Sequence, residues 1–150
     1  MQAPGTFAEW SDLFDRLRTA GYEDELLKAA REGTFEWEPV TADLWAEELM
    51  KTIQARINMA KKRFDRDYSN SKGNEGAIDR ALIQLKKDLR YAMSLSEIPC
   101  IPDEQRPVYA DEVQKTAEQF ANSLEETAKT GDRTGKILML IKKADIRNLN

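Results

Sequence analysis

The sequence predicts an all-α fold, a single-domain bundle of four to five helices with a long antiparallel helical hairpin at its centre. Apolar residues recur at helical spacing along most of the 150 residues. Charged residues make up 33% of the chain and hydrophobic residues 41%, as in packed amphipathic helices. Valine, which strands favour, occurs only three times. A chain of this length can bury a proper core without a disulfide or a metal.

Two short helices are expected first. Thr6 and Glu9 have capping-box spacing, in which the threonine hydroxyl accepts a free backbone N–H and the glutamate reaches back. An aromatic face follows, and Gly21 is a natural stop. The second helix is expected over residues 23–32, with acids in its first turn and bases toward its end. A connector over residues 34–40 then holds two aromatic residues, which we interpret as plugging the core, with a docking knob as the alternative.

The longest periodic stretch runs over residues 41–68 and predicts the first arm of the hairpin. Its apolar positions follow heptad spacing, which favours a narrow seam against a neighbouring helix. These positions are Ala46, Met50, Ile53, Ile57, Ala60 and Phe64. Residues 69–74, with the sequence SNSKGN, predict a break, and a helix over residues 75–95 should then return antiparallel to the first arm.

The rest of the chain predicts one more long helix and a tail. Three prolines within residues 98–107 exclude a continuous helix there, because each lacks a backbone donor. A helix over residues 107–129 follows, and Gly131 and Gly135 bracket a second break. We therefore expect a bundle domain over residues 1–135. Residues 136–150 should form a short tail, apolar and then polar, that docks on the bundle or on a partner.

The chemistry-bearing residues argue against an enzyme. Histidine is absent from the sequence, which removes the commonest general base and the commonest zinc ligand. Cys100 lies between prolines and near acids that would raise its thiol pKa, so we interpret it as an apolar filler. Residues 131–136 resemble a phosphate-binding loop but have one residue too few between the glycines. We expect no catalytic residue, no cofactor and no metal site, although a carboxylate-only magnesium or calcium site stays open.

Charge is distributed in blocks along the chain, whose net charge is −4. Residues 1–48 hold twelve acidic and four basic residues, whereas residues 49–98 hold six acidic and eleven basic ones. The basic block can balance the acidic block inside the protein, or it can form a ridge that binds a phosphate backbone. The candidate residues for such a ridge are Lys51, Lys62, Arg66, Lys87 and Arg90.

The leading functional hypothesis is a non-catalytic helical module for protein–protein interaction, or a small subunit of a larger assembly. Its partner would be another protein or a second copy of the chain in a homo-oligomer. The candidate contact residues are the aromatic residues Phe7, Trp10 and Phe14 and the apolar tail residues Ile137, Leu138 and Ile141. The alternative is a subunit of a nucleoprotein complex that uses the basic ridge. With one cysteine and no apolar segment long enough to span a bilayer, we expect a cytoplasmic protein without membrane contact.

Overall fold

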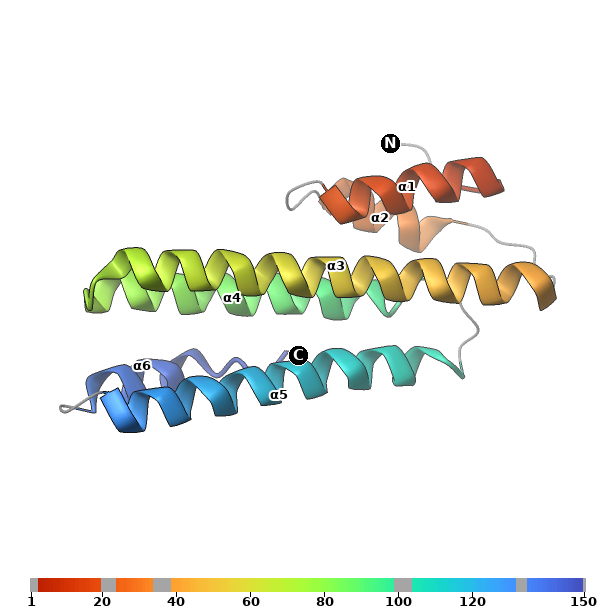
Figure 1. Cartoon of the computed structure of the whole chain (residues 1–150). Helices are drawn as coiled ribbons and strands as arrows, with labels where there is room; N and C mark the ends of the chain where they lie inside the picture. The colour runs from red at the N-terminus through yellow and green to blue at the C-terminus, as the bar shows by residue number, and fades with distance from the viewer. Residues whose placement is uncertain (1–2, 20–23, 34–38, 99–103, 132–134, 150) are drawn as a thin grey trace. The chain divides into compact units, whose positions relative to one another are not determined.

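The computed structural model describes residues 3–19, 24–33, 39–98, 104–131 and 135–149, and the described residues form six helices and no strand (Figure 1). The helices are α1 (Phe7–Thr19), α2 (Asp24–Glu32), α3 (Pro39–Ser71), α4 (Glu75–Leu95), α5 (Arg106–Gly131) and α6 (Lys136–Ala144). The all-α class is therefore confirmed. The described residues contain one helix more than the largest number expected, because the apolar start of the tail is helical. The expectations at Gly21, at residues 34–38 and at Cys100 lie outside the described residues.

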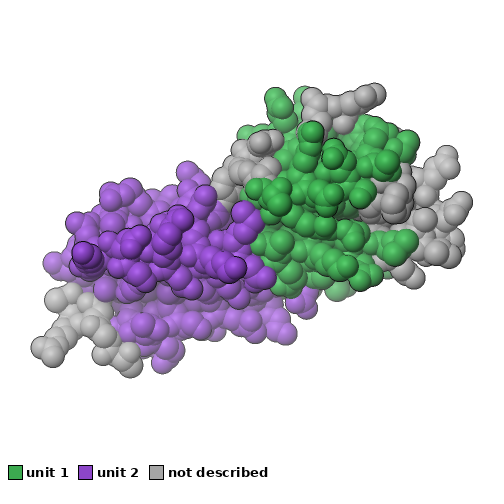
Figure 2. All heavy atoms as spheres, turned by 45° about the horizontal axis from the view of Figure 1, so that its top comes forward, with its two compact units in different colours: residues 1–56, 91–111 green, residues 57–90, 112–150 purple. Residues whose placement is uncertain are grey.

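The chain divides into two compact units, each built from two segments (Figure 2). Unit 1 comprises residues 1–56 and 91–111, and unit 2 comprises residues 57–90 and 112–150. Helices α3, α4 and α5 each contribute residues to both units. No helix in the described ranges is both long enough and apolar enough to cross a membrane.

The core of unit 1 collects the apolar faces of α1, α2 and the first part of α3. Trp10 and Phe14 are 0% and 1% exposed, and their ring centroids lie 6.0 Å apart. Gly33 packs so close to Trp10 that a Cβ atom built on it would lie 2.5 Å from a ring carbon. The residue after α2 therefore has to be small. The other large buried side chains of this core include Leu17, Leu26, Leu49 and Ile53.

Two arginines connect α1 to α3 inside unit 1. The Arg18 guanidinium pairs with Glu48 and donates from Nε to the Thr52 hydroxyl at 3.2 Å. Arg56 is only 6% exposed, donates to the Leu17 carbonyl at 3.3 Å and stacks over a tyrosine ring. The Arg56 contact gives a partner to one backbone carbonyl in the last turn of α1, where carbonyls have no partner within the helix.

The start of α1 shows a variant of the predicted capping box. The Glu9 backbone N–H donates to the Thr6 hydroxyl oxygen at 3.3 Å, as expected. The Glu9 carboxylate, however, accepts a hydrogen bond from the Thr6 hydroxyl, with 2.9 Å between the two oxygens. The side chains of the two residues thus bond to each other at the helix N-terminus.

Unit 2 is built on the second part of α3 and the first part of α4. The predicted seam is confirmed at Ile57, Ala60 and Phe64, which are 1%, 2% and 3% exposed. The Phe64 ring meets the Phe120 ring of α5 edge-on, with centroids 5.6 Å apart. Buried side chains of α4 complete this core, among them Ile78, Leu82, Leu85 and Leu89.

The turn between α3 and α4 is shorter than the predicted break, because α3 continues to Ser71. Lys72 and Gly73 have positive φ angles of 48° and 81°, which reverse the chain within two residues. Asn74 then caps α4, since its side-chain oxygen accepts the Ala77 backbone N–H at 2.9 Å. A turn this tight holds the adjoining ends of α3 and α4 close together.

The C-terminal segment, α6 and the residues that follow it, is part of unit 2 and contributes to its core. Ile141, Ile146 and Leu149 are 4%, 1% and 5% exposed. Arg147 donates to both carboxylate oxygens of Glu125 at 2.8 and 3.0 Å. The end of the chain is thus not a solvated polar tail, since two of its last five residues are buried apolar side chains.

Candidate functional site

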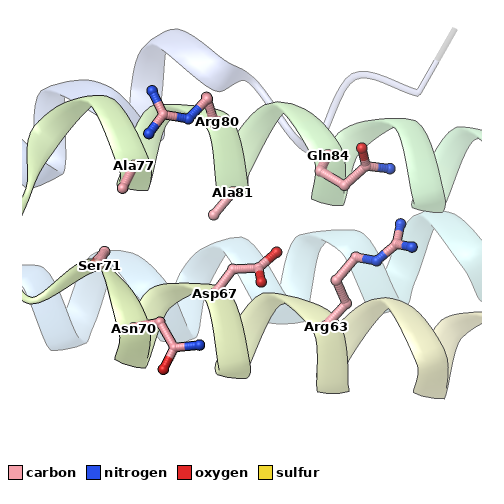
Figure 3. Close-up of a pocket in the computed structure, with 8 residues that line it drawn as sticks. All are labelled: Arg63, Asp67, Asn70, Ser71, Ala77, Arg80, Ala81 and Gln84. Atoms are coloured by element: carbon pink, nitrogen blue, oxygen red, sulfur yellow. The ribbon is translucent and has the colours of Figure 1, made fainter.

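A groove of about 450 Å³ lies in unit 2 between the end of α3 and the start of α4 (Figure 3). The groove exists because three of its lining residues are small. Ser71, Ala77 and Ala81 stand where larger side chains would fill the gap between two packed helices. The complete lining is Arg63, Asp67, Asn70, Ser71, Ala77, Arg80, Ala81 and Gln84. Its volume is within the range of about 300 to 1,000 Å³ that is usual for ligand-binding pockets.

Two arginines and one aspartate set the charge of the groove. Arg63 contributes from α3 and lies with its Nη1 atom 3.5 Å from the Asp88 carboxylate. Asp67 projects into the gap in Figure 3, and its carboxylate pairs with the Arg66 Nε atom at 3.4 Å. Arg80, on α4, has no ion pair with any residue that the structure describes. The groove therefore carries one positive charge that no carboxylate of the described residues balances.

Asp88 supports one end of the groove. Its side chain is 8% exposed, and its Oδ1 atom accepts a hydrogen bond from Gln84 Nε2 at 3.0 Å. Burial raises the pKa of Asp88 to about 6, because a carboxylate loses hydration inside the protein. The buried carboxylate holds both Gln84 and Arg63, so it positions two of the side chains that line the groove.

The outer face of α4 adjoins the groove at Arg80. Residues 80, 83, 87 and 90 follow each other at spacings of three, four and three, and therefore lie on one side of the helix. Arg80, Lys87 and Arg90 are exposed, and Ile83 between them is 46% exposed. Within residues 80–90 the acid is Asp88, which is buried, whereas half-buried Asp79 lies four residues before Ile83 and therefore on the same side of the helix. We call residues 80, 83, 87 and 90 the basic face of α4.

The predicted basic ridge is only partly retained. All five of its residues are exposed. Lys51, however, belongs to unit 1, where its Nζ atom lies 3.4 and 3.9 Å from the carboxylates of Glu47 and Glu48. Lys62, Arg66, Lys87 and Arg90 belong to unit 2. Of these, only Lys87 and Arg90 lie on the basic face of α4.

The predicted protein-contact residues lie mostly inside the protein. Trp10 and Phe14 belong to the core of unit 1, and Ile141 to that of unit 2. Ile137 and Leu138 are half-buried, and the prediction at Phe7 lies outside the described side chains. The most exposed apolar side chain of α6 is Met139, at 70%. The described surface thus offers other apolar residues for a contact than those expected from the sequence.

The sequence contained a signal for the basic face but not for the groove. Neither Arg80 nor Ile83 is among the candidate residues that the sequence predicted. The helical spacing of residues 80, 83, 87 and 90 would have identified this face. The groove depends on which residue of α3 stands opposite which residue of α4, and this register is a tertiary feature.

Within the described ranges, no group of three or more histidine, cysteine, aspartate or glutamate residues is arranged to hold a metal ion. Comparison of the chain with protein-family models, with curated proteins and with solved structures gave no match.

Proposed function

We propose that the chain is a non-catalytic helical module for protein–protein interaction, or a small subunit of a larger assembly, acting in the cytoplasm as a single bundle built around the α3–α4 hairpin. One observation carries the proposal, namely that Ile83 is 46% exposed on a helix face where Arg80, Lys87 and Arg90 are exposed too. The partner is another protein or a second copy of this chain.

The chemistry of this face favours a protein partner. A single exposed apolar side chain is common on any surface and carries no argument alone. Here, however, Ile83 has Arg80 three residues before it and Lys87 four residues after it, with no exposed acid between them. Protein interfaces combine an apolar centre with a polar rim, and arginine is enriched in them. The matching surface would present an apolar side chain surrounded by acids.

The test is a selection of peptides from a random library against the intact protein. The selected peptides should be acidic with at least one apolar residue, and Ile83→Ser should weaken their binding about tenfold, as for a central interface residue. Val108→Ser is the matched control, because Val108 is 58% exposed on α5 and lies outside the basic face. Peptides that bind both variants equally well would refute the proposal. Light scattering of the protein alone then shows whether a second copy is the partner.

A second candidate is a subunit of a nucleoprotein complex. It is favoured by the exposure of Lys62, Lys87 and Arg90 in unit 2, since cations neutralise a phosphate backbone. Against this candidate, the apolar side chain of Ile83 on the same face would contribute nothing to the binding of a charged phosphate backbone. Binding of a short DNA or RNA duplex that falls steeply with salt, and that Ile83→Ser leaves unchanged, would favour this candidate over the first.

A further inference from the structure

We propose that the groove between α3 and α4 binds an acidic segment of the partner protein, with one carboxylate at Arg80 and a second at Arg63. The inference rests on the proposed function and adds the chemical class of the segment and the place where it binds. It is carried by the shape of the groove, by its charges and by its continuity with the basic face of α4.

The shape of the groove suits inserted side chains rather than a flat contact. Its floor includes the methyl groups of Ala77 and Ala81, and Figure 3 shows both pointing into the gap between the helices. Asn70 and Gln84 also belong to the lining, and Figure 3 shows the Asn70 amide pointing away from α4. A partner side chain that enters this space would therefore meet apolar contact at the floor and hydrogen-bonding groups around it.

The charges of the groove select carboxylates. Arg80 has no ion pair with a described residue, so a carboxylate bound to it would not have to displace one. Arg63 is 45% exposed and keeps part of its guanidinium available beyond the single 3.5 Å contact with Asp88. A guanidinium has five N–H donors in a planar fork, so it can pair with two carboxylates at once.

Asp67 disfavours a uniform polyanion in the same place. Its carboxylate lies in the lining with Arg63 and Arg80, so a chain of phosphates along the groove would meet a negative charge as well as two positive ones. A peptide can place its acids at the arginines and a neutral residue at Asp67. Arg80 also belongs to the basic face of α4, so one segment can contact both the groove and Ile83.

The experiment is an NMR titration of the ¹⁵N-labelled full chain at low salt. The probes are synthetic peptides that carry two glutamates separated by one to five serines, because the spacing that binds best reports the separation of the two arginine sites. The backbone amides of Asn70, Ala77, Ala81 and Gln84 should shift. Matched peptides with glutamine in place of glutamate should produce no shifts, and inorganic phosphate and a twelve-nucleotide DNA strand are the competing anions.

Three variants separate the groove from general charge attraction. Arg80→Gln should weaken the best peptide about tenfold, the effect of losing one charge-assisted contact. Ala77→Leu keeps every charge and fills the groove, so it should weaken binding at least as much. Lys115→Gln removes one exposed positive charge on α5 outside the groove and should change affinity less than about twofold, since exposed charges are well screened. A thermal melt of each variant shows that it is folded.

Each other outcome overturns the inference. If Lys115→Gln weakens binding as much as Arg80→Gln, the attraction is diffuse, and if Ala77→Leu has no effect, the groove is not used. Phosphate or DNA that shifts the same amides more strongly than the peptides would assign the groove to phosphate. If no peptide shifts any signal, the proposal that the groove binds an acidic segment is refuted. The proposed function is decided separately, by the library selection and Ile83→Ser.

Discussion

Replacing Asp88 by asparagine tests whether the buried carboxylate weakens the folded state. The side chain is 8% exposed, and burial raises its pKa from 3.8 to about 6. Each pKa unit is equivalent to about 1.4 kcal/mol, so ionised Asp88 costs the folded state up to about 3 kcal/mol at neutral pH. The side-chain amide oxygen that Asp88→Asn introduces can still accept the Gln84 hydrogen bond, which limits any loss of contacts.

The size of the gain is limited by the pair with Arg63. That arginine is 45% exposed, and pairs with an exposed partner contribute less than about 1 kcal/mol. We therefore expect Asp88→Asn to raise the free energy of unfolding at pH 8 by about 1 to 3 kcal/mol. For a chain of this size the melting temperature should rise by about 3 to 10 °C.

The pH dependence gives the sharper test, because its sign follows from the raised pKa. Below pH 3.8 the carboxyl is protonated in both the folded and the unfolded protein, so the substitution should have little effect. Between pH 3.8 and about 6 the unfolded protein ionises first, and the stability of the parent falls as pH rises. The advantage of Asp88→Asn should therefore grow through this window and stay constant above it.

The assay is urea unfolding followed by circular dichroism at pH 4, 5, 6 and 8. Asp65→Asn is the matched control, since Asp65 is exposed on α3 and its loss should change stability by less than about 0.5 kcal/mol. An Asp88→Asn variant that is less stable than the parent at pH 8 would refute the reasoning. It would show that the pair with Arg63 outweighs the cost of burial.

Three further substitutions test the packing of the two units by thermal melts. Phe64→Ala should destabilise unit 2 by about 3 to 5 kcal/mol, because Phe64 is 3% exposed and its loss leaves a cavity. An unchanged melting temperature would contradict the burial of Phe64 in the apolar seam. Gly33→Ala should cost about 1 to 3 kcal/mol, because the new methyl group would lie 2.5 Å from a Trp10 ring carbon. Arg147→Ala should cost about 1 kcal/mol at pH 7. Arg147 holds the pKa of Glu125 below its ordinary value, so this cost should shrink as pH falls and Glu125 is protonated; a cost independent of pH would contradict the ion pair.

The bounds of the helices were largely readable from the sequence, because caps and apolar periodicity act within a few residues. The predicted helix over residues 75–95 is α4, Glu75–Leu95, with Asn74 as its cap. The heptad positions of α3 are buried from Ile53 onward. Earlier in the same helix the prediction was less accurate, because Leu49 rather than Met50 is fully buried. An ideal helix drifts relative to a strict heptad, so the contacts of the neighbouring elements decide which residue faces inward.

Which apolar surfaces stay exposed was decided only by the tertiary structure. Trp10 and Ile141 have the sequence character of contact residues, yet each is buried in its own unit. A local pattern shows that a helix has an apolar side but not what covers it. The Trp10 ring, for example, lies against Gly33, which follows another helix.

The candidate site likewise has one part that the sequence determines and another that only the tertiary structure creates. The spacing of Arg80, Ile83 and Lys87 on one helix face is a local property that the sequence determines by itself. The groove requires Ala77 on α4 to lie opposite Ser71 on α3, as in Figure 3, so only the packing of the two helices creates it. Even the raised pKa of the buried carboxylate on α4 is a tertiary effect, because loss of hydration depends on every element packed around it.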